Sequence, residues 1–184
     1  MILLSHIVKR SLKIFYYTKI KRKSMRDIQL DYFRKIGMKI GNDCYIFSDK
    51  IETTEPYLIS IGNNVTIAND VKFATHDASA NFYLEGVSDI YGRIIIGNHC
   101  FIGMGSLILP GVSIADNTII AAGSVVTQSI HEPGYVYGGN PAKKIGAIAE
   151  LKAKHSEKKL MTWGMSFEEK REYLLNHENL FKQC

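Results

Sequence analysis

The chain has 184 residues, of which 46% are hydrophobic and 22% are charged, and its formal net charge is +5. This composition is typical of one soluble domain with its own core, and it excludes a disordered chain. The basic residues gather toward the two ends. The centre is therefore not a basic groove, and we expect no nucleic-acid-binding body.

The first 36 residues form the predicted N-terminal helical segment. Apolar residues recur at helical spacing up to Phe15, with basic residues between them. These charges interrupt the apolar run well before the ~20 residues that a transmembrane helix needs, and no signal-peptide cleavage site follows. Two hypotheses remain: a helix packed on the end of the body or on a neighbouring subunit, or a basic amphipathic helix on an anionic membrane surface. A second helix is predicted over residues 27–36.

A six-residue repeat dominates the centre of the chain. Aliphatic residues occur at six-residue intervals: Ile96, Ile102, Ile108, Ile114, Ile120 and Val126. A second series follows each of these by four residues: Cys100, Ser106, Val112, Thr118, Ser124 and Ile130. Since each member of the second series lies two places before the next aliphatic residue, both point to one face of a short strand, the inner face. Small and turn-forming residues follow each aliphatic residue, as a corner requires. The repeat predicts a solenoid.

Three strands and three corners make a coil of 18 residues, so residues 18 apart should stack. The stacked pairs are Ile96 on Ile114, Ile102 on Ile120 and Ile108 on Val126. The repeat begins at Ile40 and is interrupted by three extra residues near 53–56. It is interrupted again between Phe73 and Ile96, where seventeen extra residues predict that 77–93 leave the body as a loop. Such loops commonly carry function. About four coils result.

Beyond the repeat, residues 147–184 are predicted to form a helical cap. An open solenoid end exposes strand edges and needs a cover. A helical run is expected from about Ile145 to Met161, followed by a break near Gly164. A second helix should begin after Ser166, because Glu169 completes a capping box. The predicted organisation is therefore 1–36, 37–146 and 147–184.

The three cysteines are too few and too scattered for a disulfide framework or a zinc site. Cys44 and Cys100 occupy inward positions of the repeat and are expected to be reduced core residues, while Cys184 ends the chain. A reducing cytoplasm is the simplest compartment, with the inner face of the membrane as the alternative suggested by the N-terminal segment.

The hexapeptide pattern of residues 37–146 resembles that of the left-handed parallel β-helix acyltransferases. The resemblance implies an all-β solenoid, a left-handed parallel β-helix with N-terminal and C-terminal α-helical appendages. The hand comes from the resemblance alone, because ordinary parallel crossovers are right-handed. The resemblance also implies a homotrimer with active sites between subunits and acetyl-CoA as co-substrate, and no metal is expected.

The string from Phe73 to Asp77, FATHD, resembles the active-site segment of polysaccharide and lipopolysaccharide O-acetyltransferases, close to the maltose and galactoside acetyltransferases. In that family one histidine is the general base, which implies this role for His76. An imidazole that titrates near neutral pH can take the proton of a sugar hydroxyl as it attacks a thioester. Asp77 could orient the ring only if the chain turns there, because adjacent side chains of a strand point in opposite directions. The other histidines fit no motif and are expected to be surface or packing residues: His6, His99, His131, His155 and His177.

Residues 138–146, GGNPAKKIG, resemble the closing motif that lines the coenzyme A tunnel in that family. The resemblance implies that Lys143, and less strongly Lys144, pairs with the 3′-phosphate of the coenzyme. The alternative is a turn that starts a helix and carries solvated lysines. The resemblance further places Met104, Ala122 and Thr127 on the coenzyme. Met104 replaces a small polar residue of the galactoside enzymes, which a backbone contact would tolerate and a side-chain contact would not.

The acceptor is less well defined than the coenzyme. The carboxylate and the asparagine that position the sugar in the maltose and galactoside enzymes have no recognisable match. Tyr83, with Phe82 and Tyr91, could stack on a sugar ring or could simply pack, and Asp77 is the other candidate for acceptor contact.

The leading hypothesis is an acetyl-CoA-dependent O-acetyltransferase acting on a sugar of a surface polysaccharide or its precursor. An antibiotic or another small hydroxyl acceptor is the nearest alternative. A γ-carbonic-anhydrase-like metal-dependent hydratase is a different class, but the chain lacks the paired histidines five residues apart that those enzymes carry. A non-catalytic scaffold is the last alternative, and the presence of both His76 and GGNPAKK argues against it.

Overall fold

The computed structural model describes residues 24–48, 51 and 54–181. The predicted amphipathic segment up to residue 23, with its packing and membrane alternatives, lies outside the described residues. The chain divides into two compact units, residues 1–145 and 146–184. We describe each unit by itself.

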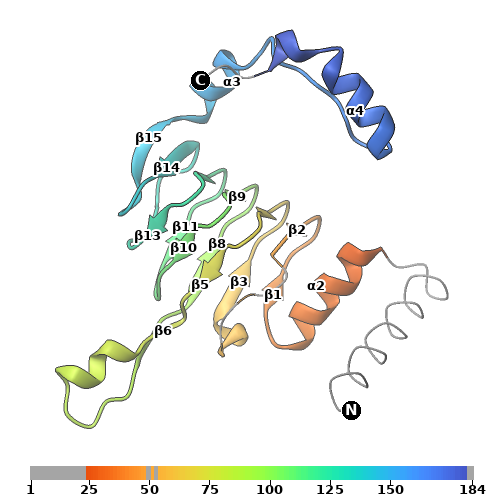
Figure 1. The fold of residues 1–184 in the computed structure, drawn as a ribbon. Helices are drawn as coiled ribbons and strands as arrows, with labels where there is room; N and C mark the ends of the chain where they lie inside the picture. The colour runs from red at the N-terminus through yellow and green to blue at the C-terminus, as the bar shows by residue number, and fades with distance from the viewer. Residues whose placement is uncertain (1–23, 49–50, 52–53, 182–184) are drawn as a thin grey trace. The chain divides into compact units, whose positions relative to one another are not determined.

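The first unit consists of short parallel strands in three sheets that the chain visits in turn (Figure 1). Sheet A contains β1 (Lys39–Ile40), β3 (Ile59–Ile61), β8 (Ile94–Ile96) and β11 (Ser113–Ile114). Sheet B contains β2 (Tyr45–Ile46), β4 (Thr66–Ile67), β9 (Phe101–Ile102), β12 (Ile119–Ile120), β14 (Tyr135–Gly138) and β15 (Lys143–Ala147). Sheet C contains β5 (Lys72–Phe73), β10 (Leu107–Ile108) and β13 (Val125–Val126). We call one full turn of this three-sided winding a coil, and the stack of turns together the coil body, or simply the coil where no single turn is meant.

The strand register confirms the predicted stacking. Ile96 lies opposite Ile114, Ile102 opposite Ile120, and Ile108 opposite Val126, each pair 18 residues apart. After Val126 the winding becomes shorter, because Ile120 pairs with Tyr137 and Ile114 with Ile130. This shortening coincides with the point at which the sequence repeat fades.

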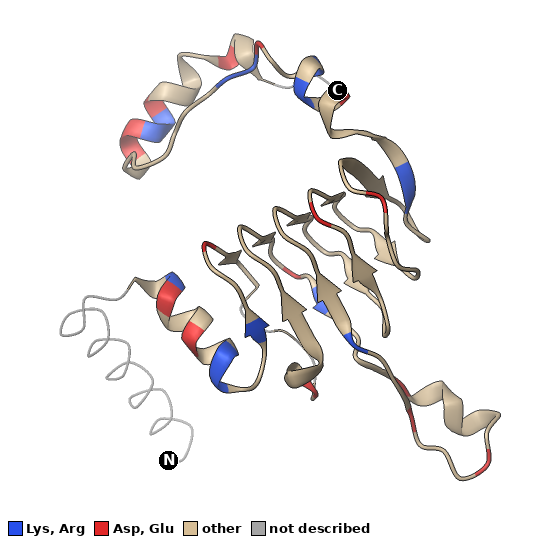
Figure 2. Cartoon of the chain, turned by 180° about the vertical axis from the view of Figure 1, so that it is seen from behind, with Lys and Arg blue, Asp and Glu red and all other residues tan. Residues whose placement is uncertain are grey.

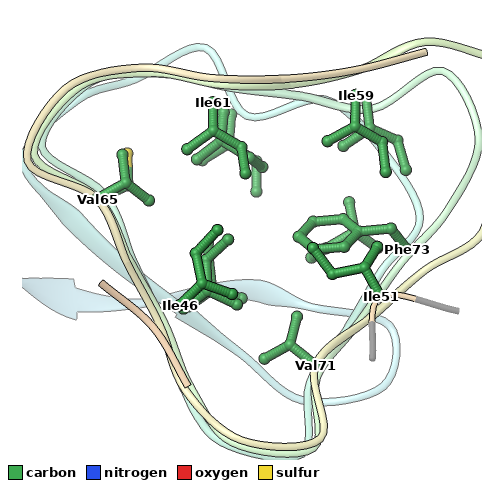
Figure 3. Close-up of a cluster of buried hydrophobic side chains, with 14 of the residues drawn as sticks. Ile46, Ile51, Ile59, Ile61, Val65, Val71 and Phe73 are labelled. Carbon is green, nitrogen blue, oxygen red and sulfur yellow. The ribbon is translucent and has the colours of Figure 1, made fainter. Parts of the chain in front are cut away.

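The inner face of the coil is filled by stacked aliphatic side chains. Ile59, Ile67, Phe73 and Ile102 are fully buried, and Figure 3 shows side chains from the three sides meeting in the interior. Cys44 and Cys100 are buried free thiols, as predicted. They donate weak hydrogen bonds to main-chain carbonyls: the Cys44 Sγ lies 3.1 Å from Gly62 O and the Cys100 Sγ lies 3.2 Å from Ala115 O. These thiols are core residues.

The corner between sheets A and B contains a ladder of Asn and Asp side chains. The backbone N–H of Asn42 donates to Asn63 Oδ1 (2.8 Å), that of Asn63 to Asn98 Oδ1 (2.9 Å), and that of Asn98 to Asp116 Oδ1 (2.7 Å). A Cβ added to Gly62 would lie only 2.8 Å from the backbone of the next coil, so no side chain fits there. The ladder holds successive coils at one spacing.

Few charged residues lie on the stacked strands (Figure 2). Within the described strands of sheets A and C, the charged residues are Lys39 and Lys72. The strands of these two sheets are therefore largely uncharged.

Helix α2 (Met25–Lys35) packs against the first coil. Ser24 and Asp27 form its capping box, and Leu30 and Phe33 are buried in the same core cluster as the coil residues. The guanidinium of Arg34 donates to Ile40 O (3.2 Å) and Gly41 O (2.7 Å). The helix begins two residues before the predicted range and covers the start of the winding. Within the described residues, no helix has the length and apolar character needed to cross a membrane.

The second unit contains α3 (Ile148–Lys154), α4 (Phe167–Leu175) and the short 3₁₀ helix η4 (Glu178–Leu180). The predicted capping box is present: Ser166 N donates to Glu169 Oε2 (2.7 Å), and Glu169 N donates to Ser166 Oγ (3.2 Å). The prediction of a long helix from Ile145 to Met161 is wrong. Strand β15 extends to Ala147 beside β14, and α3 ends at Lys154. The capping role of this unit stays a prediction.

The alternation along β8 gives a matched pair of stability variants. Ile96 faces the core with 2% of its surface exposed, whereas its neighbour Ile95 faces outward with 45% exposed. We expect Ile96→Ala to lower the free energy of unfolding by about 2–5 kcal/mol, because it removes buried methyl groups and leaves a cavity. Ile95→Ala should cost much less. Urea denaturation of both variants measures the difference, and equal losses would contradict the inward assignment.

Candidate active site

The predicted loop after Phe73 is a β-hairpin. Strand β6 (His76–Asp77) pairs antiparallel with β7 (Ile90–Tyr91), and a 3₁₀ helix, η3 (Ala78–Phe82), follows β6. The hairpin projects away from the coil (Figure 1). At its base, Gly92 N donates to Thr75 O (2.9 Å). A Cβ on Gly92 would lie 2.1 Å from Gly111 N, so the hairpin base lies directly against the next coil.

Both interruptions of the repeat fall at the same corner, between sheets C and A. In the first coil the extra residues follow Ile51, and Lys39 pairs with Ser60, 21 residues later. In the second coil the hairpin follows Phe73, and Ser60 pairs with Ile95, 35 residues later. Since the coils stack in register elsewhere, the two insertions lie one above the other. The carboxylate of the first insertion therefore meets the histidine of the second.

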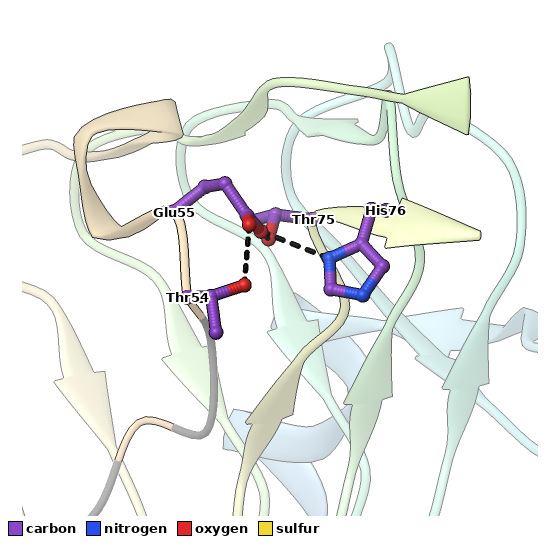
Figure 4. Close-up of polar contacts among 4 residues, drawn as sticks. All are labelled: Thr54, Glu55, Thr75 and His76. Atoms are coloured by element: carbon purple, nitrogen blue, oxygen red, sulfur yellow. Dashed lines mark hydrogen bonds and ion pairs between the residues drawn. The ribbon is translucent and has the colours of Figure 1, made fainter. Parts of the chain in front are cut away.

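That carboxylate belongs to Glu55, which immediately precedes the 3₁₀ helix η2 (Pro56–Leu58). Its Oε2 lies 2.9 Å from His76 Nδ1, and it also accepts from the Thr75 hydroxyl at 2.6 Å (Figure 4). The hydroxyl of Thr54 donates to Oε1. Both carboxylate oxygens of Glu55 are therefore held, and the side chain is almost fully buried.

Sequence reasoning missed Glu55. Asp77, the sequence-based candidate for orienting His76, instead accepts a hydrogen bond from Ser79 N (2.9 Å) and caps η3. The extended backbone of Asp77 explains this, because neighbouring side chains of a strand point apart. A signal was available: the extra residues near Glu55 and the hairpin that begins with His76 both precede a strand of sheet A, β3 and β8.

The contacts of Glu55 define the electrostatics of the pair. Hydrogen bonds from Thr54, Thr75 and His76 lower the pKa of Glu55 to about 2, so it is ionised at neutral pH. The hydrogen bond to Glu55 raises the pKa of His76 above its ordinary value of 6.5, and Asp89 and Asp77 add to the effect. An ionised carboxylate can only accept, so Nδ1 of the neutral imidazole carries the proton and Nε2 has a free lone pair.

The imidazole is partly accessible, with 37% of its side-chain surface exposed. Tyr91 lies opposite His76 in the hairpin register, and the two ring centroids are 5.8 Å apart. The nearby Asp89 carboxylate raises the pKa of Tyr91, so its phenol stays protonated. Phe82 and Tyr83 lie beyond this pair on the hairpin and are exposed, Phe82 to 91%. Of the three loop aromatics, Tyr91 is the one in contact with His76.

The residues expected at the coenzyme fall on two different corners. Met104 and Ala122 lie in the corner between sheets B and C, where Gly123 N donates to Met104 O (2.8 Å). Thr127 directly follows β13 and lies in the corner between sheets C and A, the corner of His76. Sheet C separates the two groups.

The two lysines of the closing motif have different surroundings. Both belong to β15, not to the start of a helix as in the alternative reading of the sequence. The Lys144 ammonium pairs with Glu132 and lies 3.9 Å from the centroid of the Tyr135 ring. Glu132 also raises the pKa of Lys144. Lys143 is exposed. Lys144 is therefore engaged within the chain, and Lys143 is the better candidate for an external phosphate.

Potential metal ligands do not cluster in the described part of the chain. No group of three His, Cys, Asp or Glu side chains there could hold a metal ion.

The contact between Glu55 and His76 predicts a titration that can be measured without substrate. In the wild type, the His76 imidazole should titrate above pH 6.5, because the ionised Glu55 stabilises its charged form. Glu55→Gln removes that charge and should lower the pKa of His76 toward its ordinary value. NMR titration of labelled imidazole, assigned with His76→Gln, measures both values. Asp77→Asn is the control and should shift the pKa less; a larger shift from Asp77→Asn than from Glu55→Gln would contradict the assignment.

Known proteins resemble this chain in sequence and fold. A family model described as bacterial transferase hexapeptide (six repeats) matches residues 93–128. Protein CapG of Staphylococcus aureus is 45% identical over 155 residues, covering 82% of this chain and 90% of CapG. A maltose O-acetyltransferase from Clostridium difficile has a similar structure, with a TM-score of 0.56 and 25% identity over 77% of this chain and 84% of that one.

A hexapeptide-repeat acetyltransferase from Vibrio cholerae, solved in complex with acetyl-coenzyme A, has a TM-score of 0.50 and 25% identity, covering 60% of each chain. The match to CapG spans most of both proteins at an identity that indicates common descent. The chain therefore belongs to the bacterial transferase hexapeptide family, and it is an acyltransferase of that family.

Proposed function

We propose that the chain is an acetyl-CoA-dependent O-acetyltransferase that acetylates a sugar hydroxyl of a surface polysaccharide or its precursor. The observation that carries the proposal is the contact between His76 and the ionised Glu55 at an accessible corner. The names of two relatives support the reaction: one is a maltose O-acetyltransferase, and another was solved with acetyl-coenzyme A.

In this proposal, Nε2 of His76 takes the proton of the acceptor hydroxyl while the hydroxyl oxygen attacks the carbonyl carbon of the thioester. The resulting imidazolium is stabilised by Glu55 through Nδ1. Collapse of the tetrahedral intermediate breaks the carbon–sulfur bond, and the proton on Nε2 passes to the departing coenzyme A sulfur. The acetyl ester and the free thiol leave, and His76 is again neutral.

The positions of the predicted coenzyme residues favour a site between subunits. Met104 and Ala122 lie on one side of sheet C, while Thr127 and His76 lie on the other. An extended coenzyme arm that runs parallel to the axis along which the coils stack cannot contact both corners of one chain. In a homotrimer, the Met104 corner of one protomer could face the His76 corner of its partner. The largely uncharged strands of sheets A and C suit this packing, and we infer the left-handed winding that the family implies.

The hairpin is the proposed acceptor-binding element. Tyr83 is exposed near its tip, and Asp77 lies next to His76 at the N-terminus of η3, so both are candidates for contact with the acceptor. The same aromatic surface would also accept an antibiotic hydroxyl compound. A panel of sugars and macrolides in a thiol-release assay distinguishes these two acceptor classes. A cytoplasmic location and membrane contact through the N-terminal segment also stay predictions.

His76→Gln tests the proposed base. We expect kcat to fall about 10²–10⁴-fold, the usual contribution of a general base, with acetyl-CoA affinity nearly unchanged. Because the base acts unprotonated and its pKa is raised, wild-type activity should be lost as the pH falls through a value above 6.5. Thiol release and calorimetry provide the two measurements. His99→Ala, at another corner, is the matched control and should keep full activity; activity of His76→Gln near that of the control would refute the role of base.

Lys143→Ala tests the proposed phosphate contact. Loss of one charge-assisted hydrogen bond should weaken coenzyme A binding about tenfold, with little change for dephospho-coenzyme A, which lacks the 3′-phosphate. Lys144→Ala should have the smaller effect, because its ammonium is already paired with Glu132. Calorimetry with both ligands makes the comparison. Equal weakening of both ligands by Lys143→Ala would exclude a specific 3′-phosphate contact.

A further inference from the structure

We propose that Thr75 is a positioning residue, whose hydroxyl fixes the Glu55 carboxylate in the orientation that meets Nδ1 of His76. The catalytic consequence rests on the proposed function, whereas the structural consequence for His76 does not. The starting observation is that one oxygen, Oε2 of Glu55, accepts from both Thr75 (2.6 Å) and His76 (2.9 Å).

The carboxylate needs an anchor because a glutamate side chain rotates about three bonds. An ordered conformation costs side-chain entropy, and in Glu55 it must be maintained beside a partly accessible imidazole. Thr54 and Thr75 hold the two oxygens from opposite ends of the group. Thr54 is exposed, but Thr75 is only 1% exposed. Thr75 is therefore the anchor inside the protein.

Thr75 is itself rigidly placed. It lies between β5 and β6, two residues after Phe73, its β-branched side chain has few rotamers, and its carbonyl accepts from Gly92 N at 2.9 Å. This last bond ties it to the returning strand of the hairpin. Thr75 thus joins three parts of the site: the first-coil insertion through Glu55, the coil through β5, and the hairpin through Gly92. Substitution of its hydroxyl should change how firmly Glu55 contacts the imidazole.

A purely electrostatic role of the hydroxyl makes the opposite prediction. If Thr75 only withdrew charge from Glu55, its removal would make the carboxylate more basic and would raise the pKa of His76. If Thr75 positions the carboxylate, its removal should loosen the contact and lower the pKa of His76 toward 6.5. The other groups around the imidazole stay the same in both cases: Asp77, Asp89 and Tyr91 from the hairpin. Tyr57, two residues after Glu55, acts on Tyr91 and is also unchanged.

The experiment compares Thr75→Val, which has nearly the same shape without the hydroxyl, with Thr75→Ser, which keeps the hydroxyl. Imidazole NMR titration gives the pKa of His76 in each full-length protein, and thiol release gives kcat and KM. For Thr75→Val we expect a lower pKa of His76 and a roughly fivefold lower kcat, the usual effect of one hydrogen bond, at unchanged KM for acetyl-CoA. Thr75→Ser should have the pKa of His76 and the kcat of the wild type. Thr75→Ala is the second hydroxyl-free variant if the valine protein does not fold.

An unchanged or raised pKa of His76 in the hydroxyl-free variant overturns the proposal, even if kcat falls, because a merely structural role would lower activity without moving the titration. Failure of Thr75→Ser to restore the pKa overturns it as well. The titration uses no substrate. If wild-type protein acetylates no acceptor while the pKa of His76 still falls in Thr75→Val, the proposed function fails and the positioning role stands.

Discussion

Parallel hydrogen bonding between successive coils is the constraint on which the rest of the structure depends. Each strand is only a few residues long, so no single strand is stable alone, and every coil is held by its neighbours. The register must then return to the same aliphatic position in each coil, as Ile96 does on Ile114. Extra residues are tolerated only where no strand pairing is broken, which means at the corners. The corner between sheets C and A contains both insertions.

The candidate site is a product of these insertions rather than of the repeat. A regular corner of this coil is narrow: at the Asn63 corner, successive coils approach so closely that glycine is required. Extra chain at the corner between sheets C and A gives room for side chains of neighbouring coils to meet outside the core. Glu55 enters from the first coil and His76 from the second, and Oε2 of Glu55 accepts from both His76 and the buried hydroxyl of Thr75. The regular stacking of the coils fixes the spacing between the two insertions, and the insertions contain the polar side chains of the candidate site.

The sequence predicted the parts of the fold that burial imposes. Ile102 and Ile108 lie where the six-residue interval requires, because an outward shift by one residue would expose every aliphatic side chain. Glu55 could not be found in this way, since residues outside the repeat carry no periodic signal and its partner is 21 residues away. The prediction of a helix from Ile145 was wrong for a related reason. Its first residues belong to β15 beside β14, and local helix propensity does not report a sheet edge in need of pairing.

The base and the far end of the hairpin differ in how firmly they are held. Its base is fixed by the Gly92–Thr75 hydrogen bond and by the pairing of His76 with Tyr91, so the imidazole is held close to the coil. Its far end, with Phe82 exposed, has little packing of its own. Substitutions at the tip can therefore change the exposed surface of the hairpin without moving Glu55 or the ring. Under the proposed function, acceptor preference would therefore depend on the residues from η3 to Tyr83 more than on the coil.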